Sequence, residues 1–209
     1  MTTRRWITRR NITVLGLATA GFLAAVAGPA SAANAAEVPP PAKELPADFQ
    51  LQENGYYCGP AATRVALSAQ GKTYTQDEVA QKLGTTPNGT DSINQVTSAL
   101  NAELGPDRYH SVTIAGPKAT PEQVAQLKTD VVTAINAGKP VVTNIAGVVT
   151  DQEGQTHSYK GGHYLPVVGY AGSGDTVTIA DSYDSDGKAH YTITTDQLAN
   201  WTATRGYSA

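Results

Sequence analysis

The chain contains a single cysteine, Cys58, and the residues around it constrain local structure more than any other segment. Gly59 and Pro60 follow Cys58, and a run of helix-favouring residues then extends to Leu67. Proline fits the first position of a helix, where its missing N–H costs nothing. The pattern therefore predicts Cys58 at or just before a helix N-terminus. Free backbone N–H groups and the helix dipole at such a position lower the pKa of a thiol and favour the reactive thiolate.

Gln52, six residues before Cys58, carries a side-chain amide that can donate a hydrogen bond. Beside the backbone N–H of Cys58, it would complete the pair of donors that holds the oxyanion in acyl transfer. The alternatives are a buried cysteine that packs as a small hydrophobic residue and a glutamine that is an ordinary loop amide. A base near the thiol would decide between these interpretations.

Among the four histidines, His163 is the candidate for this base. It follows Gly161-Gly162 and opens an apolar run to Tyr170, which predicts a buried strand. A turn and a second strand then lead to Asp181, 18 residues after His163. In an antiparallel hairpin the end of the second strand lies beside the start of the first. The spacing therefore predicts that Asp181 orients His163, as cysteine catalysis requires of a third group.

Structural roles compete with these assignments, because His163 could be a core histidine at a strand edge and Asp181 could cap a turn. His110, His157 and His190 are interpreted as surface or strand residues without a role in chemistry.

No cofactor or metal is expected. A single cysteine leaves no zinc-binding pattern, and there is no glycine-rich phosphate loop. The segment 184–187 departs from the calcium-binding EF-hand pattern and is predicted to be a hairpin turn.

The N-terminal segment has the pattern of a secretory signal peptide. Four arginines lie within the first ten residues, residues 12–26 are apolar, and Ala30-Ser31-Ala32 matches a cleavage site. We therefore expect residues 1–32 to be removed from a secreted bacterial protein, extracellular or associated with the cell wall, without stable membrane insertion. The Arg9-Arg10 pair leaves both the general secretory and the twin-arginine routes open.

Residues 33–48 are rich in alanine and proline, which is typical of an extended linker. Residues 49–209 are predicted to form the folded domain, whose last recognisable element ends at Trp201. One hydrophobic core suffices for a domain of this size. A monomer is the default expectation.

The order of hydrophobic patterns indicates the fold class. Helical patterns dominate the first half, strand patterns dominate the second, and there is no internal repeat, so the sequence predicts an α+β domain. This order also places Cys58 on the helical half and His163 on the sheet half, so that a cleft between the halves would face both residues. The expected helices are near 60–70, 75–84, 90–100, 120–137 and 195–201, and the expected strands are 109–114, 141–145, 162–170, 176–180 and 189–193.

Charge and cysteine content exclude some classes of function. The formal net charge is −3 and the sequence has no basic stripe, which argues against a nucleic-acid partner. One cysteine cannot form an internal disulfide, and an unpaired thiol in an exported protein indicates reactivity or intermolecular pairing.

The segments around Gln52 and Cys58-Gly59-Pro60, Gly162 to Tyr170, and Ile179-Ala180-Asp181 resemble the papain-like cysteine peptidases. More narrowly, they resemble the branch that processes bacteriocins with double-glycine leaders, and its secreted relatives. The resemblance covers about residues 49–201 and implies the papain-like fold, with helices packed on a C-terminal antiparallel sheet.

The resemblance also implies a role for each candidate: Cys58 as nucleophile, His163 as general base and acid, Asp181 as the orienting carboxylate, and Gln52 as oxyanion donor. The sequence has no transporter membrane domain or ATP-binding cassette, so we do not expect the leader-processing exporter role to carry over.

The sequence therefore predicts a secreted cysteine peptidase that acts on a peptide or protein substrate. One rival on the same fold is an acyl-transferring or amidase activity. Another is a catalytically inactive secreted binding domain, although such a domain has no need for all four site residues.

Overall fold

The structure, a computed structural model, describes residues 41–183 and 189–209. The predicted signal peptide, the first part of the predicted linker and the predicted turn at 184–187 lie outside the described residues. The helices are α1 (Cys58–Ser68), α2 (Gln76–Leu83), α3 (Ile93–Leu104), α4 (Pro121–Asn136) and α5 (Thr195–Trp201), with a short 3-10 turn, η1 (Gly172–Gly174). The strands are β1 (Lys43–Glu44), β2 (Ser111–Val112), β3 (Val141–Thr150), β4 (Thr156–Ala171), β5 (Thr176–Ala180), β6 (His190–Thr194) and β7 (Gly206–Ser208).

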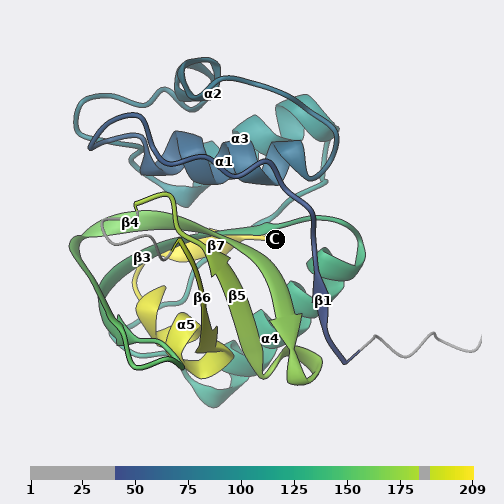
Figure 1. The fold of residues 1–209 in the computed structure, drawn as a ribbon, viewed down its shortest axis with the longest axis vertical. Helices are drawn as coiled ribbons and strands as arrows, with labels where there is room; N and C mark the ends of the chain where they lie inside the picture. Colours follow the sequence, from purple (N-terminus) through teal and green to yellow (C-terminus); the bar gives the residue numbers. More distant parts are fainter. Residues whose placement is uncertain (1–40, 184–188) are drawn as a thin grey trace, which may run out of the picture. The chain divides into compact units, whose positions relative to one another are not determined.

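Within the described part of the chain, the strands form one antiparallel sheet in the order β2-β7-β3-β4-β5-β6, and β1 pairs with β4. The helices α1, α2 and α3 lie together on one side of the sheet, and α4 and α5 lie on the other (Figure 1). The predicted α+β class, with a helical N-terminal half packed on a C-terminal antiparallel sheet, is confirmed.

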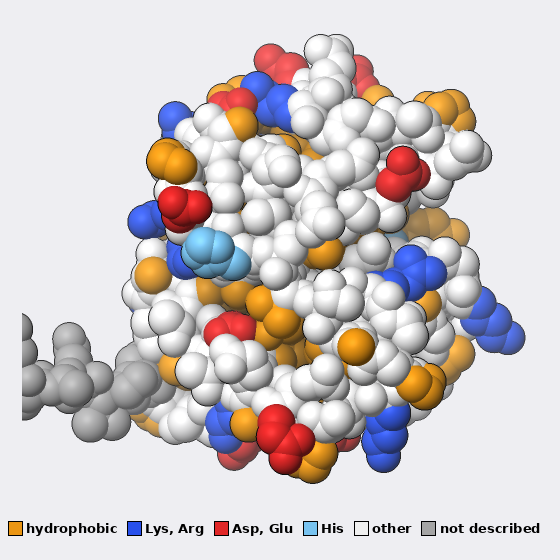
Figure 2. All heavy atoms as spheres, turned by 180° about the vertical axis from the view of Figure 1, so that it is seen from behind, with side chains coloured by type: hydrophobic (Ala, Val, Ile, Leu, Met, Phe, Trp, Pro, Cys, Tyr) orange, Lys and Arg blue, Asp and Glu red, His pale blue; other side chains and the backbone are white. Residues whose placement is uncertain are grey.

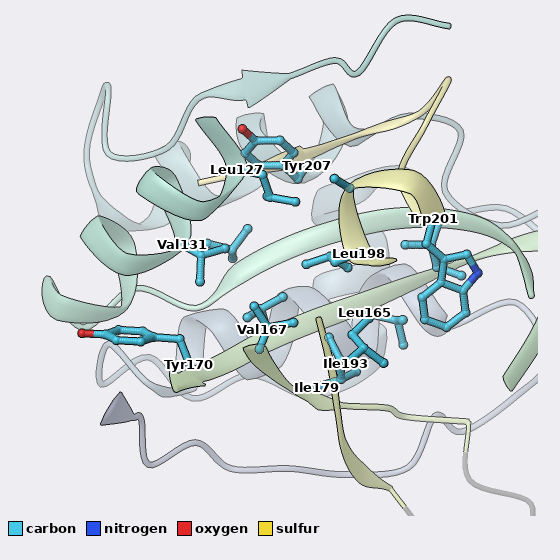
Figure 3. Close-up of a cluster of buried hydrophobic side chains, with 14 of the residues drawn as sticks. Leu127, Val131, Leu165, Val167, Tyr170, Ile179, Ile193, Leu198, Trp201 and Tyr207 are labelled. Atoms are coloured by element: carbon cyan, nitrogen blue, oxygen red, sulfur yellow. The ribbon is translucent and has the colours of Figure 1, made fainter. Parts of the chain in front are cut away.

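Each face of the sheet carries a hydrophobic cluster. On one face, Leu127 of α4 and Leu198 of α5 pack against β4 and its neighbours (Figure 3). On the other face, α1, α2 and α3 pack against Val142 and Tyr164. The adjacent residues Tyr164 and Leu165 belong to opposite clusters. Because both faces are covered, β4 reads as a continuous apolar run rather than an alternating one.

Local signals fix the helix starts that the sequence predicted. The Thr75 hydroxyl accepts a hydrogen bond from the N–H of Glu78, and the Glu78 carboxylate accepts one from the N–H of Thr75, which forms a capping box. Thr120 caps α4 in the same way, and Pro121 occupies its first position. These contacts span only three or four residues, which is why sequence alone locates them.

The end of the predicted linker, at residue 48, lies within the folded domain. Lys43 and Glu44 form β1, which pairs with Tyr170 and Gly169 of β4. A Cβ at position 169 would lie 2.9 Å from the Lys43 carbonyl oxygen, so this approach requires glycine. Asp48 forms an ion pair with the buried Arg64 of α1. The folded domain therefore begins before the predicted boundary at residue 49.

The sequence also missed the last strand. β7 follows α5 and enters the sheet between β2 and β3, where Tyr207 pairs with Val112 on one side and with Thr143 on the other. Three residues are too few to show a strand period, so only their partners reveal them.

No helix among the described residues is long and apolar enough to cross a bilayer. The face opposite to that of Figure 1 carries charged side chains of both signs as isolated groups, with no continuous basic patch (Figure 2).

Candidate active site

Cys58 is the first residue of α1, as its position before Gly59 and Pro60 predicted. Pro60 lies third in the helix rather than first, and it is tolerated there because the N–H groups of the first turn have no partner within the helix. Gly59 allows the loop before α3 to come close, since a Cβ at this position would lie 2.3 Å from the Thr90 hydroxyl oxygen. The thiol therefore lies where the helix start meets the rest of the domain.

His163 and Asp181 meet as the hairpin spacing predicted. His163 lies in β4, and Asp181 follows β5, which pairs with β4. The Nε2 atom of His163 lies 2.8 Å from Oδ1 of Asp181, and both side chains are buried. A carboxylate at this distance fixes the ring orientation and stabilises the imidazolium.

The thiol of Cys58 and the imidazole of His163 interact. Because Nε2 of His163 faces Asp181, Nδ1 is the ring nitrogen left for the thiol. Burial alone would raise the pKa of Cys58, but the hydrogen bond and the charge of His163 lower it, helped by the backbone N–H groups of Tyr164 and Gly59. The net direction is a lowered pKa, which favours the thiolate.

The pKa values of His163 and Asp181 shift in the directions that an ion pair requires. Burial alone would lower the pKa of His163, but the hydrogen bonds to Asp181 and Cys58 and their charges raise it to about 9. For Asp181, burial acts to raise the pKa, and the hydrogen bond and charge of His163 outweigh it, so the pKa is lowered. At neutral pH these directions favour a thiolate, an imidazolium and a carboxylate side by side.

Two tyrosines that the sequence did not identify hold Asp181. The hydroxyl of Tyr159 donates to Oδ2 of Asp181 at 2.7 Å, and the hydroxyl of Tyr191 donates to the same oxygen at 3.0 Å. Oδ1 accepts the backbone N–H of Tyr183 at 2.9 Å, in addition to His163. The carboxylate is thus held by donors on both oxygens.

Tyr159 also stacks on His163, with ring centroids 4.2 Å apart and an interplanar angle of 22°. In a regular strand, residues four apart are separated by about 13 Å. Here Ile145 pairs with His163 and Gly147 pairs with Tyr159, so residues 160–162 face a single residue of β3. This bulge brings the two rings together, and Gly161-Gly162 was the only sequence signal for it.

The structure corrects the interpretation of His157. It lies on β4, as one alternative had it, but it is buried and its Nε2 lies 3.0 Å from Oδ2 of the buried Asp151. The His157 ring stacks on Tyr191 at 3.7 Å. The sheet therefore contains a second buried histidine–aspartate pair, which is joined to Asp181 through Tyr191.

Gln52 lies against Ser182, the residue after Asp181, and its hydrogen bonds go to Ser182 and Asn54 rather than to Cys58. Its backbone N–H donates to the carbonyl of Ser182 at 2.9 Å, and its Oε1 accepts from the Ser182 hydroxyl at 3.3 Å. Its Nε2 donates to the Asn54 carbonyl at 2.7 Å. Gln52 and Ser182 line a cavity of about 200 Å³. Asn54 therefore takes one of the two amide N–H donors of Gln52 and leaves the second for an oxyanion.

Across residues 41–183 and 189–209, the structure brings together no group of three or more histidine, cysteine, aspartate or glutamate side chains that could hold a metal ion.

Several solved structures of peptidases are similar in fold. A C39-like peptidase from Bacillus anthracis matches with a TM-score of 0.53 and 14% identity, over 79% of this chain and 96% of that chain. A double-glycine motif protease from an AMS/PCAT transporter, solved with its leader peptide, has a TM-score of 0.49 and 12% identity over 79% and 91%. The peptidase domain of Streptococcus ComA, a bifunctional ABC transporter of a quorum-sensing pathway, has a TM-score of 0.47 and 16% identity over 79% and 95%. At these identities the likeness concerns the fold.

No protein with a curated description matches the sequence. The profile of the Peptidase_C39 like family matches residues 43–209, which begins at β1 and spans every described helix and the whole sheet. By this match over most of its length, the chain belongs to the Peptidase_C39 like family of cysteine peptidases.

Proposed function

We propose that the protein is a secreted cysteine peptidase that hydrolyses peptide or amide bonds with Cys58 as nucleophile. The observation that carries the proposal is the set of three interacting groups. The pKa of the Cys58 thiol is lowered beside His163, the pKa of His163 is raised to about 9, and Asp181 lies 2.8 Å from the imidazole. Membership of the family supports a peptide or protein substrate.

In the first half of the reaction, the Cys58 thiolate attacks the carbonyl carbon of the scissile bond. The carbonyl oxygen becomes an oxyanion, which accepts the backbone N–H of Cys58 and the side-chain amide of Gln52. One amide N–H of Gln52 donates to Asn54, so the oxyanion takes the second. Protonated His163 then gives its proton to the leaving amine, and the C–N bond breaks to leave a thioester on Cys58.

In the second half, neutral His163 takes a proton from water, and the resulting hydroxide attacks the thioester carbonyl. Collapse of the second oxyanion breaks the C–S bond and releases the acid. The proton returns the pair to thiolate and imidazolium. Asp181 holds the ring through both halves.

The test measures alkylation of Cys58 by iodoacetamide against pH, in the mature protein and in His163→Ala, together with hydrolysis of a degenerate peptide library. We expect half-maximal alkylation well below the free-thiol value of about 8.5, a shift back toward it in His163→Ala, and hydrolysis that Cys58→Ala abolishes. A thiol that titrates normally and a library that stays intact would instead support the inactive binding domain. Transfer of the acyl group to an added amine would identify the acyl-transferring rival.

The role of Gln52 has its own measurement. Gln52→Ala should lower kcat by roughly 10²- to 10³-fold, because one of two oxyanion donors is lost. Ser182→Ala is the matched control, since it removes only the hydroxyl that donates to Oε1 of Gln52 at 3.3 Å and keeps the backbone hydrogen bond between the two residues. Equal kcat in Gln52→Ala and the wild type would remove Gln52 from the mechanism.

Secretion is proposed from the N-terminal pattern of residues 1–32. N-terminal sequencing of protein collected from the culture medium of a bacterial host should begin close to Ala33. Full-length protein retained in the cells would contradict this part of the proposal.

A further inference from the structure

A polar cavity of about 380 Å³ lies beside the candidate active site and has no part in the proposed mechanism. Asp91, Ser92 and Asn94, at the start of α3, form one wall. Asn144 of β3 and Arg205, in the loop before β7, form the other.

One wall of the cavity is continuous with the nucleophile. Asp91 directly follows Thr90, whose side chain packs so closely on Gly59 that a Cβ there would lie 2.3 Å from its hydroxyl oxygen. Gly59 is the residue after Cys58. The Asp91 wall is therefore connected to the start of α1 through a single side-chain contact.

The opposite wall is continuous with the base. The guanidinium of Arg205 lies against Gly162, where a Cβ would come within 2.7 Å of Nη1. Gly162 is the residue before His163. The hydroxyl of Tyr164 joins the two walls, because it donates to the Thr90 carbonyl at 3.1 Å and accepts from Nδ2 of Asn144 at 3.0 Å. The two walls of the cavity therefore adjoin the residues next to Cys58 and His163.

Arg205 has capacity for a ligand. Its side chain is half-buried, and Nη1 donates to Oδ1 of Asn144 at 3.3 Å. Among the described residues, no carboxylate lies within ion-pair distance of its guanidinium. A guanidinium has five N–H donors in a planar fork that matches a carboxylate, and partial burial reduces solvent screening of its charge.

The backbone on both sides of Arg205 is fixed. Thr204 has φ 67°, which is unusual for a β-branched residue, and its N–H donates to the Ile114 carbonyl at 2.8 Å. Gly206 has φ 120°, and a Cβ there would lie 2.3 Å from the Val112 carbonyl oxygen. The guanidinium is therefore presented from a constrained loop rather than from a free surface.

We propose that Arg205 is a specificity-determining residue that binds a carboxylate of the peptide substrate. The inference rests on the proposed peptidase function and adds the chemistry of one subsite to it. The carboxylate comes from an acidic side chain or from the free C-terminus of the peptide. Asp91 faces the same cavity but is exposed, so solvent and salt screen its charge more than that of Arg205.

The test compares amidated peptides that differ only by glutamate or glutamine at each position in turn, and peptides with free or amidated C-termini. The kcat/KM values of the wild type should favour glutamate at one position, or the free C-terminus, by about tenfold. Arg205→Gln should remove this preference, as measured by the ratio of kcat/KM within each glutamate and glutamine pair. Arg205→Glu should reverse the charge preference, so that a peptide with lysine at the same position is preferred over the glutamate peptide.

Arg108→Gln is the matched control, because Arg108 also contacts one amide oxygen at 3.3 Å, that of Gln70, and does not line this cavity. It should keep the wild-type preference. Thermal unfolding checks that each variant is folded. If Arg205→Gln is not folded, Arg205→Lys, which retains the charge, takes its place. Equal preference for the acidic and neutral peptides in the wild type and in folded Arg205→Gln would overturn the inference.

Binding to Cys58→Ala protein separates this inference from the proposed function. Calorimetry with the same peptide pairs reads the carboxylate preference without any hydrolysis. If the wild type hydrolyses nothing but Cys58→Ala binds the acidic peptides more tightly in an Arg205-dependent way, the subsite stands and the peptidase proposal fails. If hydrolysis depends on Cys58 but neither assay distinguishes the peptides, the subsite fails alone.

Discussion

The sheet contains two buried histidine–aspartate pairs that look alike locally and differ in what lies next to them. In both, Nε2 of the histidine meets an aspartate oxygen, at 2.8 Å for His163–Asp181 and at 3.0 Å for His157–Asp151. In both, a tyrosine stacks on the imidazole ring. Only His163 also interacts with a thiol, that of Cys58.

The two aspartates have different further partners. Asp151 accepts the backbone N–H groups of Glu153 and Gln155, at 2.9 and 2.8 Å, and so holds the turn between β3 and β4. Asp181 accepts two tyrosine hydroxyls and the N–H of Tyr183. A buried histidine–aspartate pair therefore does not indicate catalysis by itself. The feature that distinguishes the His163–Asp181 pair is the thiol of Cys58 beside the histidine.

Replacing each aspartate by asparagine should separate the pairs most clearly. Asp181→Asn should lower kcat by about 10³- to 10⁴-fold, because the imidazolium loses its counter-charge and its tautomer. Asp151→Asn should leave kcat within a factor of a few and instead lower the free energy of unfolding by about 1–3 kcal/mol, because a buried hydrogen-bond network is disturbed. Peptide hydrolysis and urea unfolding of both variants measure this. Similar kcat losses in the two would mean that both pairs serve catalysis.

The pH profile should depend on one pair only. The thiolate forms above the lowered pKa of Cys58, and the imidazolium is lost above the His163 pKa of about 9, so kcat/KM should plateau between these values and fall about tenfold per pH unit beyond them. His157→Gln should leave both limits in place. A limit that moves in His157→Gln would show that the second pair is electrostatically coupled to the first.

The same shift in His163 predicts a pH dependence of stability. Its pKa in the folded state lies above the ordinary value of 6.5, so the imidazolium stabilises the folded protein. This contribution is complete below pH 6.5 and is lost as the pH rises through about 9. The lowered pKa of Cys58 acts in the opposite direction, because the folded thiol loses its proton at a lower pH than the unfolded thiol. Urea midpoints should therefore fall less over this interval in the wild type than in Cys58→Ala, where only the His163 contribution, held by Asp181, remains.

Replacing Tyr159 or Tyr191 by phenylalanine should have the smallest effects. Tyr159→Phe and Tyr191→Phe each remove one hydroxyl donor from Oδ2 of Asp181, and the carboxylate, less compensated, should hold the imidazolium more strongly and move the upper pH limit upward. Tyr159→Phe should also lower kcat by roughly tenfold or less, because this ring additionally lies on His163. Tyr191→Phe, whose ring lies on His157, should change kcat less. Unchanged pH limits in both would assign the tyrosines to packing alone.

Elements that depend on local contacts could be predicted from the sequence. The Cys-Gly-Pro segment located the start of α1, and the capping residues Thr75 and Thr120 located α2 and α4. The distance along the chain from His163 to Asp181 was enough to predict their contact, because a tight hairpin sets its own register.

Features that depend on contacts between distant segments appear only in the folded structure. β7 is placed by strands far away in sequence, and β1 by the end of β4, so neither shows a period of its own. Tyr159 reaches His163 only because three residues of β4 bulge opposite one residue of β3, which no strand periodicity reveals. Arg205 lies against Gly162 only once β7 has joined the sheet. The contact between His163 and Asp181 could be predicted because it is local to a hairpin, whereas the groups around it are brought together by pairing between distant segments.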